Sequence, residues 1–515
     1  MCFLGLLAGC SKAGAPGGSD PAVIHFAIAA DPASLNPLAI APDAASVELQ
    51  LARLSFEPFV DLDARGRPVP ALLDRIPTRE NGGISADGRT LTFHLRPQAR
   101  WSDGTPVTSG DVLFTLRAIM DRGSAVRSTE GYDLVDRAVA LDARTVRLHL
   151  KHAWAPAATT LFSYGAQAQF VLPSRSGPFS TAAMVVDGPY QLVQWARGDR
   201  LTYRPNPHYW RASAQRSLDV RIVTDPSTNL TMLQSGELDW NLIAPSQYAV
   251  AAQQPRMRFA LTPTAVVAAL VFNTAHAPLN DVRVRRALAM AVDRGGISSK
   301  LTLGKYPVTN MLQPQFSWAY DPSIRQPGFD PHAADAALDA AGWRRGANGM
   351  RLKNGAALRL TYVQFPESST GVRVAATVQA ELRERGIEVT VKSISNAQLF
   401  LPHDGILATG NFDLAYVPFT MGADPDDSFV LACNAPSNYM RWCDQRVDAL
   451  EREALGAASV DTRKRDYAAI GGIVARDVPL LFLFNARYVY AYRDRLSGFA
   501  PNAFLPTWNA WQWRL

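Results

Sequence analysis

The chain has 515 residues, of which 47% are hydrophobic and 19% are charged, and its formal net charge is +6. At this length it is expected to contain more than one hydrophobic core, because domains average roughly 100–200 residues. The small net charge argues against a nucleic-acid-binding protein, since the one dense basic cluster, residues 283–286, lacks interleaved aromatic residues and is better explained as the solvated end of a helix.

The chain opens with an apolar segment that ends in the motif LAGC at residues 7–10 and is followed by a Gly/Ala/Pro-rich stretch. This order is typical of a bacterial lipoprotein processing site, in which small residues precede a Cys that becomes the acylated N-terminus. We therefore expect Cys10 to carry lipid, residues 11–20 to form a flexible tether, and the rest of the chain to lie outside the cytoplasmic membrane. Residues 1–10 contain no Lys or Arg, so the true leader is expected to start upstream. The alternative is a free Cys in an apolar tail.

The first half of the chain contains several predicted strands and one well-marked helix. Alternation of apolar and polar residues predicts strands at residues 23–29, 91–95 and 145–150. Thr108 or Ser109 is expected to cap a helix that ends at Met120, with Asp111 favourably placed in its first turn. A hairpin is predicted from residues 190–195 and 200–203, with its turn around Gly198.

The second half continues the alternation of helices and strands. Helices are predicted at residues 228–234, 281–292, 331–341 and 371–385, and strands at 265–272, 358–363 and 387–391. The apolar run at residues 478–486 is interrupted by Pro479 and Asn485 and is far shorter than the ~18 residues that span a bilayer. The pattern as a whole predicts α/β layers.

The four cysteines indicate one disulfide. Cys2 falls in the leader and Cys10 is expected to carry lipid, which leaves Cys433 and Cys443. An oxidising compartment would pair these two. Closing the short loop between them contributes roughly 3 kcal/mol in the chain-entropy model. No His lies near either Cys, so a zinc site is not expected.

No sequence motif of an enzyme is found. The chain has no Gly-x-Ser-x-Gly elbow, no Walker-type phosphate loop, no His-Glu-x-x-His and no Cys-x-x-Cys. We therefore assign no catalytic residue, no metal ligand and no cofactor. A secreted hydrolase that uses the carboxyl groups of Asp424, Asp426 and Asp427 is the alternative from a different functional class, because paired carboxylates at the right separation hydrolyse glycosides.

Five blocks resemble, in this order along the chain, the extracytoplasmic solute-binding proteins of ABC transporters, specifically the large oligopeptide/dipeptide-binding family (family 5). The blocks are DGRTLTFHLR at 87–96 with WSDGTPVT at 101–108, GPY at 188–190 through NPHYW at 206–210, LQSGELD at 233–239, FNT at 272–274 with DVRVRRAL at 281–288, and the run from DVP at 477–479 to YR at 492–493. The resemblance extends over nearly everything after Pro21.

The resemblance implies an α/β periplasmic-binding-protein fold with two lobes. The chain would cross between the lobes near Phe272 and return near Tyr490, and the lobes would close over the ligand by a hinge motion without a covalent step. The implied limits are residues 21–56, 187–269 and 491–515 for lobe one, 57–186 for an extra β-rich subdomain of lobe one, and 270–490 for lobe two.

The resemblance also implies a ligand anchor. Residues 419–424 resemble the segment in which peptide binders of the family place a carboxylate against the ligand's α-ammonium. Asp424 is the expected anchor, and Asp426 or Asp427 is the alternative. The interpretation without a binding role is an Asp-Pro turn that leaves Asp426 and Asp427 in solvent. The other expected ligand-binding residues are Phe419, Met421, Gly422 and Ala423.

The function implied by the resemblance is the substrate-binding component of an ABC importer, which captures di- or oligopeptides and delivers them to the permease subunits. Such a protein is expected to be a monomer at the periplasmic or cell surface, attached to the membrane by its N-terminal lipid alone. Relatives on the same fold bind nickel chelates, haem, opines or oligosaccharides, so another small solute is the alternative ligand.

Overall fold

The computed structural model describes residues 23–38, 45–121, 126, 129, 131–163, 169–175, 185–212, 214–457 and 459–515. The expected lipidation site Cys10 and the tether at residues 11–20 lie outside these residues. Within the described ranges, no helix combines the length and the apolar character that crossing a membrane requires.

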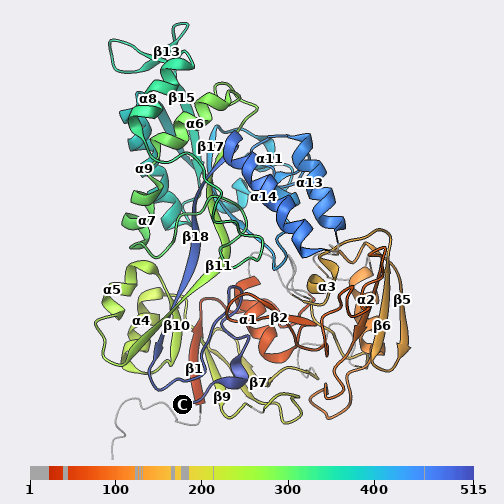
Figure 1. The fold of residues 1–515 in the computed structure, drawn as a ribbon. Helices are drawn as coiled ribbons and strands as arrows, with labels where there is room; N and C mark the ends of the chain where they lie inside the picture. The colour runs from red at the N-terminus through yellow and green to blue at the C-terminus, as the bar shows by residue number, and fades with distance from the viewer. Residues whose placement is uncertain are drawn as a thin grey trace, which may run out of the picture.

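A mixed sheet runs through the molecule, and ten of its strands lie in the described residues, in the order β16-β15-β17-β11-β18-β10-β1-β9-β8-β7 (Figure 1). Their bounds are β1 Val23–Ile28, β7 Tyr190–Ala196, β8 Arg200–Pro205, β9 Ser217–Ile222, β10 Trp240–Ile243, β11 Met257–Phe272, β15 Arg359–Gln364, β16 Glu388–Ser393, β17 Leu414–Thr420 and β18 Leu480–Arg493. Lobe one is built on β10, β1, β9, β8 and β7, and lobe two on β17, β15 and β16.

The two long strands β11 and β18 pass from one lobe to the other as an antiparallel pair (Figure 1). Their register shifts between Pro263 and Val267, where the chain leaves lobe one. The buried Asn485 bridges this irregularity, because its Nδ2 donates hydrogen bonds to the carbonyl oxygens of Thr264 at 2.9 Å and Val266 at 2.8 Å. Asn485, which interrupts the apolar run at residues 478–486, therefore stabilises the irregular pairing of β11 and β18 between the lobes.

Lobe one has an aromatic core on one face of its sheet. The rings of Phe26 and Trp240 stack at 4.5 Å, and Trp513, near the end of the chain, packs edge-on against both. The helices of this lobe are α1 Ala45–Ser55, α4 Pro226–Ser235 and α5 Tyr248–Ala251, with the 3₁₀ turns η1 Pro245–Gln247 and η2 Ala510–Gln512. Residues from both ends of the chain thus complete one core.

Lobe two buries the apolar halves of β11 and β18 beneath its helices. The helices of lobe two are α6 Val282–Ala291, α7 Arg294–Thr302, α8 Pro331–Ala340, α9 Ser369–Glu384, α10 Asn396–Leu399, α11 Ile406–Thr409, α12 Ser428–Leu431, α13 Gln445–Gly456 and α14 Val460–Asp477. A small antiparallel sheet, β12 Arg344–Arg345, β13 Arg351–Lys353 and β14 Ala356–Ala357, lies at the tip of the lobe (Figure 1).

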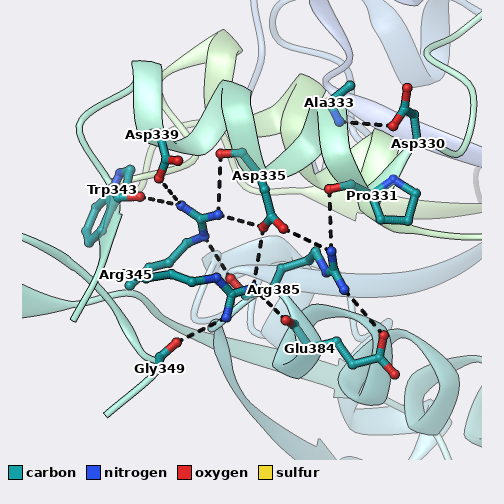
Figure 2. A network of polar contacts seen from close by, with 11 residues as sticks. Asp330, Pro331, Ala333, Asp335, Asp339, Trp343, Arg345, Gly349, Glu384 and Arg385 are labelled. Carbon is teal, nitrogen blue, oxygen red and sulfur yellow. Dashed lines mark hydrogen bonds and ion pairs between the residues drawn. The ribbon is translucent and has the colours of Figure 1, made fainter. Parts of the chain in front are cut away.

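A buried arginine joins this tip to two helices. The side chain of Arg351, which is fully buried, donates to the carboxylates of Asp335 and Asp339 on α8 and to the carbonyl oxygen of Arg385 behind α9. Asp335 also accepts from Arg385, as Figure 2 shows. Although burial raises the pKa of Asp335, the hydrogen bond from Arg351 and the charge of Arg385 hold that pKa below its ordinary value.

The subdomain of lobe one has its own sheet, β4 Thr90–His94, β6 Thr145–Leu150 and β5 Val135–Asp142, and its own apolar core. It also contains the hairpin β2 Val60–Leu62 and β3 Pro68–Pro70, and the helices α2 Ser109–Met120 and α3 Ala157–Thr160. Thr108 stands at the N-cap of α2, and the carboxylate of Asp111 accepts from its backbone N–H at 2.9 Å. The helix start expected at residues 108–109 is confirmed.

Most of the predicted elements are confirmed within one to three residues, and β6 has the predicted bounds. The predicted hairpin is formed by β7 and β8, with Gly198 at a φ of 72° in its turn. The strand predicted at 265–272 is the second half of the longer β11. Cys433 and Cys443 form the predicted disulfide. The separate cores lie on either side of the crossing, while the residue limits of the lobes stay a prediction.

Candidate functional site: a cavity between the subdomain and lobe two

A cavity of about 640 Å³ lies where the subdomain faces lobe two. From the subdomain it is lined by Pro68, Ile76, Pro77, Thr78, Arg79, Glu80, Ile84, Gly88, Leu91, Ala153, Trp154, Ala155, Ala158 and Thr159. From lobe two it is lined by Trp318, Ala423, Asp424, Gly456, Ala457, Ser459, Val460, Asp461 and Arg463. Most of these residues are apolar, as in most small-molecule sites, and a few polar groups accompany them.

The loop after β17 carries Ala423 and Asp424 to the cavity. Phe419 on β17 and Met421 just after it are buried in the core of lobe two, and the backbone N–H of Met421 donates to the carbonyl oxygen of Ala265 on β11 at 2.9 Å. The strand ends at Thr420, and Gly422 follows in the loop. The predicted segment is therefore divided, with its first residues in the core and its last two at the cavity wall.

Asp424 forms a buried, bidentate ion pair with Arg463 on α14. Nη1 of Arg463 donates to Oδ2 of Asp424 at 2.8 Å, and Nη2 donates to Oδ1. Both side chains are less than a tenth exposed. Although burial lowers the pKa of the Arg463 guanidinium, the charge of Asp424 outweighs this and raises that pKa above its ordinary value. The guanidinium of Arg463 is thus held in its charged form.

Two aromatic rings lie close to the guanidinium of Arg463. Its central carbon lies 5.2 Å from the ring centre of Trp318 and 5.6 Å from that of Tyr467, in the range of cation–π contacts. Nη2 also donates to the hydroxyl of Tyr467 at 3.1 Å. Tyr467 lies one turn after Arg463 on the same helix, so α14 presents the two side chains together.

The other two carboxyl groups of this loop do not line the cavity. Asp427 is buried and accepts from Nε2 of Gln313 at 2.7 Å. Burial raises the pKa of Asp427 to about 6 and that of the neighbouring Glu451 on α13 well above its ordinary value. Neither carboxylate oxygen of Glu451 meets a hydrogen-bond donor in the described part of the chain, so a proton held by one of these acids satisfies both.

A main-chain hydrogen bond joins the two walls at one edge of the cavity. The N–H of Ala155 in the subdomain donates to the carbonyl oxygen of Leu455 at the end of α13, at 2.7 Å. The disulfide lies near the start of the same helix, where the N–H of Cys433 donates to Asp448 at 2.9 Å. The subdomain and lobe two are therefore in direct contact in this structure.

The sequence predicted two of the residues that line this cavity. It identified Ala423 and Asp424, both of which line the cavity. It missed Arg463, because nothing in the local sequence shows that a residue 39 positions after Asp424 is its partner. Among the described residues, no group of three or more His, Cys, Asp or Glu side chains is arranged to hold a metal ion.

Comparison with known proteins places this architecture in a family. Residues 67–441 match the family of bacterial extracellular solute-binding proteins, family 5 Middle. Protein XP55 of Streptomyces lividans is 30% identical over 448 residues, which covers 83% of this chain and 78% of that protein. The probable D,D-dipeptide-binding periplasmic protein DdpA of Escherichia coli strain K12 is 26% identical over 439 residues, which covers 82% of this chain and 81% of that protein.

Solved structures agree on the fold. The ABC transporter substrate-binding protein CtaP of Listeria monocytogenes superposes with a TM-score of 0.82 at 20% identity, over 96% of this chain and all of that one. The two-lobed fold with its extra subdomain is therefore the fold expected from the sequence, and the matched family is extracytoplasmic. The chain belongs to the bacterial extracellular solute-binding proteins of family 5.

Proposed function

We propose that this chain is the substrate-binding component of an ABC importer, which captures di- or oligopeptides between the subdomain and lobe two and delivers them to the permease subunits. The cavity of about 640 Å³ carries this proposal, because its walls belong to two bodies that the strands β11 and β18 connect. A ligand enclosed by such walls is captured by hinge closure and needs no covalent step, so no catalytic residue is assigned. The similarity to DdpA supports a peptide as the solute.

Within this cavity we assign ligand contact to Ala423 and Asp424. Phe419, Met421 and Gly422 fix the loop that carries them, since the first two are anchored in the core and the backbone of Met421 is bonded to β11. Of the two alternative anchors, Asp427 is engaged by Gln313 in the core, and neither it nor Asp426 lines the cavity. This arrangement also gives no support to a hydrolase built on these three carboxyl groups.

The ligand assignment is tested by incubating the purified chain with a mixed peptide pool and identifying what it retains by native mass spectrometry. One intact peptide per chain supports the proposal. Shortened peptides would show hydrolysis and contradict it. Retention of a nickel chelate, haem, an opine or an oligosaccharide offered in the same way, with no peptide retained, would assign the cavity to that solute instead.

We also propose that the protein works as a monomer held at the periplasmic or cell surface by lipid on Cys10. An anchored binding protein remains close to its permease, and a flexible tether leaves the lobes free to move. Palmitate labelling in a bacterial host, retained by the natural protein and lost in Cys10→Ser, is the expected result. Equal labelling of both proteins would contradict the assignment of Cys10.

A further inference from the structure

The cavity wall contains a carboxylate whose charge the protein itself compensates. Both oxygens of Asp424 accept from Arg463, and Oδ1 also accepts from the backbone N–H of Asp426 at 3.1 Å. A ligand ammonium that approaches Asp424 therefore meets a pair with no net charge. It would lose its hydration without gaining an anion in return, which is costly in a partly buried site.

The side chain of Arg463 cannot move away to make the carboxylate of Asp424 available to a ligand. Its guanidinium is also bonded to the hydroxyl of Tyr467 and lies within cation–π distance of Trp318 and Tyr467. Its side chain is 6% exposed, so another position would require the surrounding rings to move. Breaking such a pair by removing one partner leaves a buried charge without compensation.

The remaining charged groups of the lining lie on exposed residues. Arg79 and Glu80 carry opposite charges on one exposed turn of the subdomain. Asp461 is exposed in the first turn of α14, where the helix dipole stabilises a negative charge. Attraction between exposed charges is weak in water, so these groups add little to ligand binding. The large side chains of the lining are apolar or aromatic: Ile76, Ile84, Leu91, Trp154, Trp318 and Val460.

We propose that the Asp424–Arg463 pair makes this cavity selective for apolar peptides whose amino terminus is blocked, and that it rejects peptides with a free α-ammonium. A blocked terminus presents a neutral amide and an apolar group, both of which match a wall without net charge. This inference rests on the proposed function and specifies its ligand class. Arg463 is the residue that determines the specificity, because its guanidinium cancels the charge of Asp424.

The test uses two forms of one tripeptide, Phe-Leu-Phe with a free amino terminus and the same peptide N-acetylated, titrated calorimetrically into the purified protein. The acetylated form is expected to bind at least about tenfold more tightly. In Arg463→Gln the carboxylate of Asp424 is released, and the ratio of the two dissociation constants is expected to shift by at least about tenfold towards the free amine. Circular dichroism verifies that this variant is folded, and the wild-type comparison decides the question if it is not.

Equal or tighter binding of the free-amine form by the wild-type protein would overturn the inference. Failure of both forms to bind would overturn it as well. The mixed-pool experiment separates this outcome from the proposed function: peptides retained from the pool with free amino termini refute only the specificity, whereas an empty protein refutes the assignment of peptides as ligands.

Discussion

At the scale of single residues, the pairing of Asp424 with Arg463 changes what a substitution in the cavity wall is expected to do. A solvated anchor would be removable without loss of stability. A carboxylate that compensates a buried guanidinium is part of the folded structure, because the arginine cannot be dehydrated alone. Binding and stability are therefore coupled at this position.

Asp424→Ala is expected to lower the free energy of unfolding by about 3–5 kcal/mol, because it leaves Arg463 buried without its counter-charge. Urea unfolding followed by circular dichroism measures the change. Asp461→Ala is the matched control, since Asp461 lines the same cavity but is exposed, and its effect is expected to stay below about 1 kcal/mol. Equal effects of the two substitutions would show that the buried pair does not stabilise the fold.

The pair Asp427 and Glu451 predicts a dependence of stability on pH. The folded state raises the pKa of both acids, that of Asp427 to about 6. The contribution of the protonated acids to the free energy of unfolding is therefore complete below an ordinary carboxyl pKa of about 4, and it is lost as the pH rises through 6 and above. Asp426 and Asp448 face this pair, and their negative charges disfavour its ionisation. The side-chain amide of Gln313 is a neutral donor to the carboxyl group of Asp427.

Glu451→Gln is therefore expected to raise the free energy of unfolding by about 1–3 kcal/mol at pH 8 and by much less at pH 5, because the amide replaces a carboxylate that must otherwise ionise while buried. Urea midpoints at the two pH values give the comparison. Glu453→Gln, an exposed change on the same helix, serves as the control. Parallel pH profiles for wild type and Glu451→Gln would contradict the shared-proton description.

At the scale of elements, local signals predicted local structure. The helix α2 was predicted from Thr108 and Asp111 because a capping interaction spans three residues, and β6 was predicted from its alternation. The first half of β11 was missed, since Pro263 interrupts the pattern of a strand. Its pairing with β18 is set by residues more than 200 positions away, and no local pattern reports that.

The tip of lobe two depends on one buried arginine, which joins α8, α9 and the small sheet (Figure 2). Arg351→Met is expected to lower the free energy of unfolding by about 2–3 kcal/mol, because the partly exposed carboxylates of Asp335 and Asp339 lose their common charged donor. Arg359→Met breaks an exposed pair with Glu388 and is expected to cost less than about 1 kcal/mol. Thermal melting ranks the two variants, and equal melting temperatures would refute this role of Arg351.

At the scale of the whole molecule, the resemblance to family 5 predicted the two lobes and the loop that reaches the cavity. The partner of Asp424 could not be predicted from the sequence. Arg463 lies on α14 and Asp424 in the loop after β17, and they meet only when lobe two is folded. The cavity also needs the subdomain, whose wall residues are remote in sequence from both. Long-range pairing of this kind has no periodic signature in the chain.

Closure of the two walls predicts a local change in hydrogen exchange. The amide of Ala155 is bonded to Leu455 across the boundary, so a retained peptide is expected to slow its exchange at least about tenfold by populating the closed form. The amide of Met421, bonded to Ala265 within lobe two, is the internal control and is expected to change little. Unchanged exchange at Ala155 on saturation with peptide would contradict hinge closure. Mass spectrometry of deuterated fragments makes the measurement.

The shared core of lobe one has a consequence for biosynthesis. Phe26 and Trp240 lie in the first half of the sequence, but the residues that pack against them include Phe499 and Trp513. The core of lobe two, in contrast, is complete once Phe484 has been added. Lobe one must therefore remain unfinished until Trp513 has been added, well after the core of lobe two can form, and its apolar strands need protection from aggregation during that interval.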